Sequence, residues 1–275
     1  MVSPMFFDKD KNPVHIKGIY DNASCFLTCG GPSLKSFNLT KLQQPGIITF
    51  GINNSVKVFR PNLWTCVDDP ANFMISIWKD PTITKFLPHP KSQPKRGKLW
   101  DNTKWDWSDK LVRDCPNVIY HFRNDHFQLE EWFYEDTINW GNNKKYGGSR
   151  SVMLQAIRII SLLGFRNVFL LGADFKMTLG EDNYSWDQDR TKQSVNNNNS
   201  TYRVLNERFK ALRPIFEKEN FFIFNCTVNS GLKAFPYMDY DSAIEFALKD
   251  FPDTLTEKAE GMYERKRIER EQEKK

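Results

Sequence analysis

The stretch Ser24–Leu34, SCFLTCGGPSL, decides which fold the sequence predicts. Ser24–Cys29 is an apolar run of the length of a buried strand, and Gly30-Gly31-Pro32-Ser33 ends it before a short helix. Glycines let backbone N–H groups approach an anion, and a helix N-terminus adds partial positive charge. We therefore expect Gly30, Gly31, Pro32 and Ser33 to bind a nucleotide phosphate. An ordinary turn is the alternative, because the spacing matches neither G-x-G-x-x-G nor G-x-x-x-x-G-K-S/T.

Two further apolar runs also end in polar residues. Gly46–Gly51 is followed by Ile52 and the pair Asn53-Asn54, and Leu63–Val67 is followed by Asp68-Asp69. In an open parallel sheet, ligands bind at the carboxyl ends of the strands, near the point where the strand order reverses. We therefore expect these strand ends to converge on one crevice beside the glycine turn.

The side chains at these strand ends suit binding and proton transfer. The amides of Asn53 and Asn54 can hydrogen-bond a ribose or a base edge, although one of them can instead cap a helix. The carboxylates of Asp68 and Asp69 can act as a general base or hold a divalent metal. Asp before Pro70 is also a common start of a turn. The pair is not a D-x-D motif, so metal dependence is not indicated.

Regular patterning returns after Gly147. Val152–Leu163 has the apolar spacing of an amphipathic helix, and Asn167–Gly172 is an apolar run typical of a central parallel strand. This strand ends in Ala173 and Asp174, which adds Asp174 to the expected nucleotide site.

The start of this helix offers a second candidate for phosphate binding. Ser149 and Ser151 can hydrogen-bond a phosphate there, with Arg150 as the charge partner. A simple serine cap explains the same residues equally well.

The order of strands and helices predicts an α/β protein with a Rossmann-like, mostly parallel sheet and helices on both faces. We expect residues 1–255 to form one nucleotide-binding catalytic domain, with 80–147 as an inserted lid over the crevice. Residues 256–275 read as a charged tail. Met177–Ser200 is polar and rich in asparagine, which predicts a mobile loop before a helix over Tyr202–Lys218.

The predicted lid interleaves basic and aromatic residues, although Val118–Phe122 within it has the pattern of a strand. Such a composition suits a sugar or nucleic-acid surface, because cations contact phosphate and aromatic rings stack. We expect Lys95, Arg96, Trp100 and Trp105 to contact the acceptor. The alternative is a lid whose tryptophans pack down on the body of the protein.

Composition is that of a soluble globular protein, with 40% hydrophobic and 27% charged residues. The net charge of +5 suits phosphate-bearing ligands, DNA included, as well as simple solubility. We recognise no signal peptide and no apolar stretch long enough to span a bilayer, so we expect a cytoplasmic protein without a membrane partner. For a viral protein this would be the host cytoplasm. The oligomeric state is left open.

Five cysteines and four histidines show no metal-ligand spacing. Most of the cysteines lie in or beside apolar runs, which favours buried, reduced thiols. We therefore expect no metal ion and no cofactor beyond a nucleotide co-substrate.

Taken in order, these segments resemble the sialyltransferases of glycosyltransferase family 42. CFLTCGGPSLKSF resembles their first strand and turn, which binds the CMP part of the donor, and Phe50–Ser55 resembles the second strand end with its nucleotide-binding Asn. Val67–Pro70 and Gly147–Phe175 are similar to the later Asn-Pro and Asp-Phe strand ends. Asn225–Phe235 resembles the Cys-Pro-Asn-Ser segment. The resemblance implies a GT-A-variant, Rossmann-like fold with a nucleotide-sugar donor. A similar turn occurs in the related 6-hydroxymethylpterin pyrophosphokinases.

The chain departs from this family pattern at three places. Cys29 replaces the first glycine of the turn, and Asp69 replaces the asparagine before proline. Met177–Tyr202 contains no histidine, whereas the family has its catalytic base there. The departures imply that Asp68 or Asp69 is the base, and that the donor is not CMP-sialic acid.

The leading hypothesis is therefore transfer of a sugar from a nucleotide sugar to a hydroxyl, with Asp68 or Asp69 deprotonating the acceptor. Arg150 or lid cations would stabilise the leaving phosphate or diphosphate without a metal. The acceptor we consider is a hydroxymethylated pyrimidine in DNA, exposed in a pocket as in phage-type DNA modification. The alternatives are Mg-dependent pyrophosphate transfer to a small alcohol such as a hydroxymethylpterin, and a non-catalytic nucleotide-binding protein.

Overall fold

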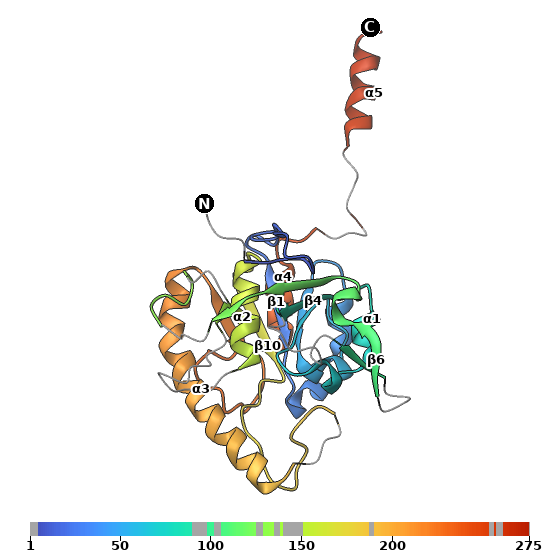
Figure 1. The fold of residues 1–275 in the computed structure, drawn as a ribbon. Coiled ribbons are helices and arrows are strands. Elements are labelled where there is room, and N and C mark those ends of the chain that lie inside the picture. Colours follow the sequence, from blue (N-terminus) through green and yellow to red (C-terminus); the bar gives the residue numbers. More distant parts are fainter. Residues whose placement is uncertain are drawn as a thin grey trace.

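A parallel β-sheet forms the centre of the molecule (Figure 1). The structure is a computed structural model, and it describes residues 5–89, 98–101, 106–124, 129–134, 138–139, 151–186, 190–252, 256 and 261–274. In spatial order the seven strands are β11 (Phe222–Asn225), β10 (Asn167–Leu171), β1 (Ser24–Thr28), β2 (Ile48–Ile52), β3 (Leu63–Thr65), β4 (Thr84–Pro88) and β7 (Val118–His121). Every neighbouring pair in this sheet is parallel.

The central strands are apolar on both sides because helices cover both faces of the sheet. Alternate residues of β1 point to opposite faces, so that Cys25 and Leu27 join one core and Phe26 joins another. The first face is covered by α2 (Val152–Leu162) and α3 (Lys192–Lys218).

The opposite face is covered by shorter elements. Next to β1 and β10 these are α4 (Tyr240–Leu248) and the 3₁₀ turns Pro32–Ser36 and Leu39–Gln43. Around Trp64 of β3 they are α1 (Ile75–Lys79) and β5 (Lys98–Asp101). The predicted Rossmann-like α/β fold with helices on both faces is confirmed, and the central sheet is parallel throughout.

The interval 80–147 predicted as a lid contributes two strands to this sheet, β4 and β7. Three further elements of the described part of this interval lie outside the main sheet. They are the antiparallel pair of β5 (Lys98–Asp101) and β6 (Asp106–Leu111), the 3₁₀ turn Val112–Asp114, and the short pair of β8 (Arg123–Asn124) and β9 (Ile138–Asn139). The lid prediction missed β4 because Lys85 interrupts its apolar pattern.

Lys85 is fully buried in β4, where backbone carbonyls take the place of water around its ammonium group. Its Nζ donates to the carbonyls of Asp80, Ile83 and Pro116, at 2.6, 2.9 and 3.0 Å. These three bonds satisfy all three ammonium protons, so a charged residue is tolerated in the interior of the sheet.

The mobile loop predicted at Met177–Ser200 is wrong in its second part, because α3 already begins at Lys192 with Thr191 as its cap. Asparagines organise the first part of this segment. The Asn183 side chain bonds the backbone of Thr178 and Glu181, and Asn199 bonds both the N–H and the C=O of Met177. The asparagine-rich composition therefore reflects side chain–backbone bonding.

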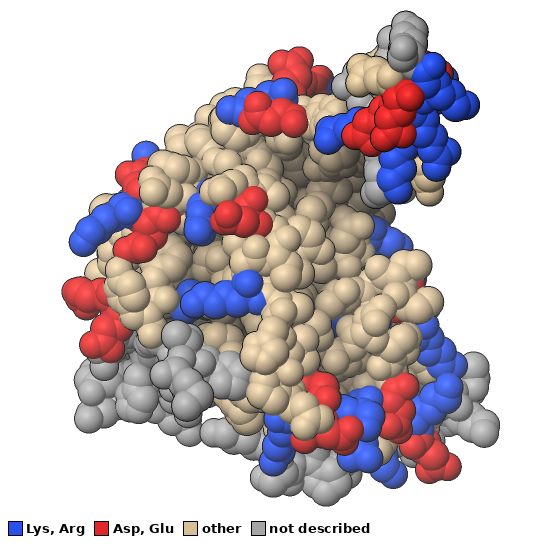
Figure 2. Space-filling model, turned by 90° about the horizontal axis from the view of Figure 1, so that it is seen from above, with Lys and Arg blue, Asp and Glu red and all other residues tan. Residues whose placement is uncertain are grey.

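Within the predicted charged tail, Figure 1 draws the helix α5 (Met262–Gln272) away from the sheet, and its residues from Tyr263 on are exposed and mostly charged. Seen from the top of Figure 1, the surface carries Lys and Arg interspersed with Asp and Glu, and the largest group of basic side chains lies on α5 (Figure 2). No helix in the described part of the chain is long and apolar enough to cross a bilayer.

Candidate functional site

A cleft of about 460 Å³ lies at the carboxyl ends of β1 and β10. The chain lays β2, β3, β4 and β7 on one side of β1 and then returns to place β10 and β11 on the other side. The order of the strands reverses between β1 and β10, which is where open α/β sheets bind their ligands. The cleft is lined by residues from several strand ends, from the start of α2 and from α3: Gly30, Gly31, Asn53, Asn54, Asp68, Ser151, Met153, Asp174, Phe175, Lys176, Tyr184, Trp186, Arg190 and Tyr202 are among them.

The glycine turn is shaped by the strand end that lies beside it. Asp174 accepts hydrogen bonds from the Ser33 hydroxyl at 2.7 Å and from the Ser33 N–H at 3.3 Å. A Cβ added to Gly31 would lie 1.9 Å from a carboxylate oxygen of Asp174 and 2.6 Å from the carbonyl oxygen of Gly172. Gly31 is therefore required so that the two strand ends can approach each other closely.

Gly30 faces the loop that follows β10. A Cβ there would meet the Trp186 ring at 2.8 Å, and the Ser185 N–H donates to the Gly30 carbonyl at 3.0 Å. Of the four predicted turn residues, Gly30 and Gly31 line the cleft, whereas Pro32 and Ser33 are not among its lining residues. The hydroxyl and the N–H of Ser33, however, donate their hydrogen bonds to the Asp174 carboxylate.

Asn53 and Asn54 both line the cleft, at the start of the 3₁₀ turn Asn53–Lys57. Asn54 donates through Nδ2 to the carbonyl of Asn72 at 3.2 Å, which fixes its Oδ1 as the free acceptor. The Oδ1 atoms of both residues are buried, and neither has a hydrogen-bond donor among the described residues. Neither asparagine side chain caps a helix; the Ser55 hydroxyl instead accepts from the Ile52 N–H at 3.1 Å.

The structure gives the two predicted carboxylates different surroundings. Asp69 is the N-cap of the 3₁₀ turn Pro70–Asn72, and its Oδ1 accepts from the Ala71 N–H at 3.0 Å. Asp68 is exposed and lines the cleft. Of the two predicted carboxylates, Asp68 is therefore the one at the cleft, whereas Asp69 is explained by its role in the Asp-Pro turn.

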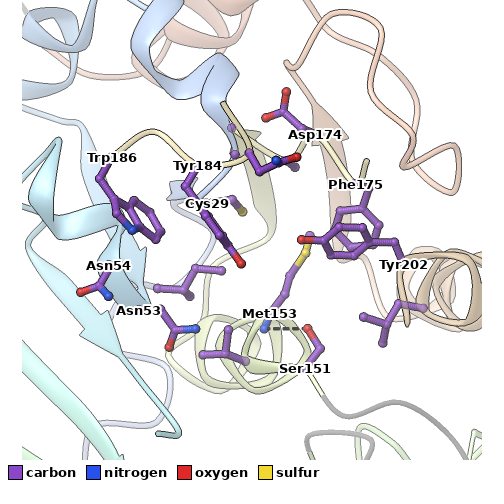
Figure 3. A pocket seen from close by; sticks show the side chains of 18 of the residues that line it. Cys29, Asn53, Asn54, Ser151, Met153, Asp174, Phe175, Tyr184, Trp186 and Tyr202 are labelled. Carbon is purple, nitrogen blue, oxygen red and sulfur yellow. Dashed lines mark hydrogen bonds between the residues drawn. The ribbon is translucent and has the colours of Figure 1, made fainter. Parts of the chain in front are cut away.

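Ser151 has the role of a cap. Its hydroxyl accepts from the Met153 N–H at 3.1 Å at the start of α2, on the floor of the cleft (Figure 3). Ser149 and Arg150 lie outside the described residues, so their predicted roles stay predictions.

Aromatic side chains that the sequence analysis did not select form two walls of the cleft (Figure 3). Tyr184 and Trp186 are stacked with ring centroids 4.7 Å apart, and Phe175 and Tyr202 are stacked at 4.9 Å. Phe175 has a positive φ of 51°, a conformation that costs free energy for a residue with a side chain. Such strain is typical of functional sites.

Two ionisable groups with raised pKa values face this space. Burial raises the pKa of the Tyr202 hydroxyl, with a smaller opposing effect from the Arg190 charge, so Tyr202 is a neutral donor at physiological pH. Burial, assisted by the charge of Asp174, raises the pKa of the Cys29 thiol to about 12. Cys29 is therefore no nucleophile here, because the thiolate is the reactive form.

Among the described residues, two cations line the cleft, Lys176 and Arg190. Lys176 is exposed at the rim, where it also borders an outer hollow with Arg203. Arg190 is half-buried and lies over the Tyr184 ring, with its guanidinium carbon 4.8 Å from the ring centroid.

Sequence reasoning missed Tyr184, Trp186, Arg190 and Tyr202. Tyr184, Trp186 and Arg190 belong to the segment interpreted as a polar loop, where two clustered aromatic residues were the only signal. Tyr202 is the first residue of the helix predicted after that loop. The predicted acceptor residues cannot be compared with the structure: Lys95, Arg96 and Trp105 lie outside the described residues, as does the side chain of Trp100. No group of three His, Cys, Asp or Glu that could hold a metal occurs in the described part.

No protein-family model and no curated protein matches this chain. Among solved structures it is similar to the sialyltransferase CstII from Campylobacter jejuni, solved in complex with the substrate analogue cytidine-5′-monophosphate. The two chains are 12% identical, and the similarity covers 79% of this chain and 85% of that chain with a TM-score of 0.40. These comparisons give no support to the pyrophosphokinase resemblance, and similarity this low does not indicate a substrate.

Proposed function

We propose that the protein transfers a sugar from a nucleotide-sugar donor to a hydroxyl acceptor, with the donor bound in this cleft. The observation that carries the proposal is the pair of buried amide oxygens of Asn53 and Asn54, which have no donor in the described part of the chain. A buried polar group without a partner costs about 1–3 kcal/mol. These oxygens are buried in the ligand-free structure, so the amides would turn towards the cleft to accept hydrogen bonds from hydroxyl or amino groups of a nucleotide sugar, which would compensate this cost.

The position of Asp174 suggests how the nucleotide lies. A carboxylate that already holds both donors of Ser33 would repel a phosphate, yet it accepts readily from hydroxyl groups. We place ribose hydroxyls near Asp174 and the glycine turn, and the phosphate away from them. The stacked pairs Tyr184–Trp186 and Phe175–Tyr202 offer flat apolar surfaces for a base or a sugar ring.

Asp68 is our candidate for the general base, because it is a carboxylate at the cleft whose oxygens are not used by a cap. In the transfer, the acceptor oxygen would bond to the anomeric carbon of the sugar while Asp68 takes the hydroxyl proton. Asp68→Asn should then reduce the rate of transfer more strongly than it reduces donor affinity.

The acceptor proposed from the sequence is a hydroxymethylated pyrimidine in DNA. It depends on Lys95, Arg96, Trp100 and Trp105, together with the net charge. A protein that acts on DNA should bind a duplex at low salt and release it as salt rises. If no electrophoretic mobility shift of duplex DNA is seen at low salt, DNA is not the acceptor, and other hydroxyl compounds remain as candidate acceptors.

The donor proposal is tested by thermal unfolding with CMP, UDP, GDP and ADP and with their common sugar conjugates. We expect at least one of them to raise the melting temperature. Asn53→Ala and Asn54→Ala should each weaken the affinity for that ligand by about tenfold. Asn197→Ala, an exposed asparagine on α3, is the matched control. If none of these compounds stabilises the protein, the proposed function is wrong.

The metal requirement separates this function from the pyrophosphokinase alternative. We propose that sugar transfer needs no metal ion, whereas pyrophosphate transfer from ATP needs Mg²⁺. Activity with the stabilising ligand should therefore survive EDTA. Binding of a nucleotide with neither transfer nor hydrolysis, with or without Mg²⁺, would favour the non-catalytic alternative.

A further inference from the structure

Arg190 lines the cleft and has a buried hydrogen-bonding atom without an acceptor among the described residues. Its Nη2 donates to the Tyr184 hydroxyl at 2.8 Å, and its Nη1 lies 3.4 Å from the Ser194 hydroxyl. Its Nε is buried and has no acceptor among the described residues. A guanidinium stays charged at any physiological pH, so this N–H must find an acceptor or remain a cost.

The charge of Arg190 also has no ion-pair partner among the described residues. Among the described residues, the hydrogen-bonding partners of Arg190 are neutral hydroxyls, and the Tyr184 ring lies against its guanidinium group. A half-buried cation with neutral partners and one free donor is a site for an anion.

The other charged groups at the cleft set where this anion can lie. Asp174 and Asp68 are carboxylates and repel a phosphate at their own positions. Lys176 is exposed, so its charge is screened by water and salt. Arg190 is the cation of the described lining that is held in a fixed direction and partly shielded from solvent.

We propose that Arg190 binds the phosphate of the donor that leaves with the nucleotide, an inference that rests on the proposed function. In the reaction, the bond from the anomeric carbon to the phosphate oxygen breaks and its electron pair stays on that oxygen. The acceptor oxygen forms the new bond to the anomeric carbon, and its proton passes to the general base. Arg190 donates hydrogen bonds to the phosphate and stabilises the added negative charge without transferring a proton. Tyr184 is then a positioning residue for Arg190.

The test compares nucleotides with their nucleosides, because only the nucleotides carry phosphate. Affinities of CMP, UDP, GDP and ADP, and of cytidine, uridine, guanosine and adenosine, are measured by calorimetry for the wild type and for Arg190→Gln. For the nucleotide that binds, we expect Arg190→Gln to weaken affinity by about 10- to 100-fold. The affinity for the matching nucleoside should change by less than about twofold. Arg203→Gln, an exposed arginine of the outer hollow, should leave both unchanged.

Two further variants separate loss of contact from loss of folding. Arg190→Lys keeps the charge but not the planar fork, so an intermediate loss of nucleotide affinity is expected. Tyr184→Phe keeps the ring but removes the acceptor of Nη2, and should weaken nucleotide binding less than Arg190→Gln does. Melting temperatures of the ligand-free variants show whether each one folds.

The outcomes distinguish the two proposals. If the wild type binds a nucleotide and Arg190→Gln and Arg190→Lys bind it equally well, Arg190 does not hold the phosphate while the donor site stands. If Arg190→Gln weakens nucleotide and nucleoside by the same factor, the residue supports the loop only, and the inference is again wrong. If the wild type binds none of these nucleotides or their sugar conjugates, the proposed function fails and this inference fails with it.

Discussion

The Asp174 carboxylate accepts hydrogen bonds from both the hydroxyl and the backbone N–H of Ser33, a residue 141 positions earlier in the chain. This pair joins the end of β10 to the turn after β1 across the point where the strand order reverses. It gives the turn a structural role, and it places a negative charge where the sequence alone indicates a phosphate.

Ser33→Ala tests this link. Asp174 is 8% exposed, so its carboxylate would lose a charge-assisted hydrogen bond that water replaces poorly. We expect the free energy of unfolding to fall by about 2 kcal/mol in urea titrations. Ser36→Ala removes an exposed bond from a hydroxyl to the carbonyl of Ser33, and should cost well under half as much. Equal effects of the two variants would show that the Ser33–Asp174 bond has no special weight.

Gly31→Ala should be more severe, because the new methyl group would overlap both the Asp174 carboxylate and the Gly172 carbonyl. Relieving the overlap requires the two strand ends to separate, at a cost of about 1–3 kcal/mol and with loss of ligand binding at the cleft. Thermal unfolding and nucleotide titration measure both effects. Gly261→Ala, where a methyl group would meet nothing closer than 3.5 Å, is the neutral control. Unchanged stability of Gly31→Ala would contradict the close approach.

Lys85→Met removes the buried ammonium and leaves three backbone carbonyls in the sheet without their donor. Part of the loss is offset, because a charge no longer has to be buried. We still expect a net destabilisation of about 3 kcal/mol, measured by chemical unfolding. Lys79→Met on α1 removes an exposed lysine and should change stability by less than about 0.5 kcal/mol. A Lys85→Met protein as stable as wild type would show that these carbonyls find other donors.

The stability of the fold should fall in alkali. Burial raises the pKa of Cys29 and of Cys226 to about 12 from an ordinary 9.0, so between these pH values the folded chain keeps protons that the unfolded chain loses. The free energy of unfolding therefore decreases as pH rises from 9 towards 12. Lys85 acts with the opposite sign between about 8 and 10.5, because burial lowers its pKa to about 8.

The effect of one lysine opposes the effects of two thiols. The free energy of unfolding should therefore still decrease with pH above pH 9. Urea unfolding at pH 7.5, 9 and 11 measures it, with reducing agent present throughout. A free energy of unfolding that stays level up to pH 11 would contradict this expectation.

Much of the architecture could be predicted because it is encoded locally. The apolar run and glycine turn of Ser24–Leu34 form β1 and its turn, and the serine cap and apolar spacing after Gly147 identify α2 and β10. Polar residues at strand ends predicted where the crevice lies. In each case a short segment carries its own signal through periodicity, capping or turn chemistry.

The rest depends on contacts between distant segments. Lys85 could not be recognised as a buried strand residue, since its three acceptors are brought to it by the fold. Arg190 and Tyr184 lie in a segment without periodicity, and their position at the cleft follows from the asparagines that fold that loop. The engagement of Ser33 by Asp174 is invisible until β10 lies beside β1.

The strand order has a consequence for how the protein matures on the ribosome. β1 is made early, and β2, β3, β4 and β7 on one side of it follow, so five of the seven strands can assemble while synthesis continues. The other wall of the cleft needs β10 and the loop after it, which leave the exit tunnel only once most of the chain has been translated. A nascent chain that stops before Asn167 therefore has an open edge at β1. Such an edge is a place for premature pairing with another chain, and the arrival of β10 closes it and completes the cleft in one step.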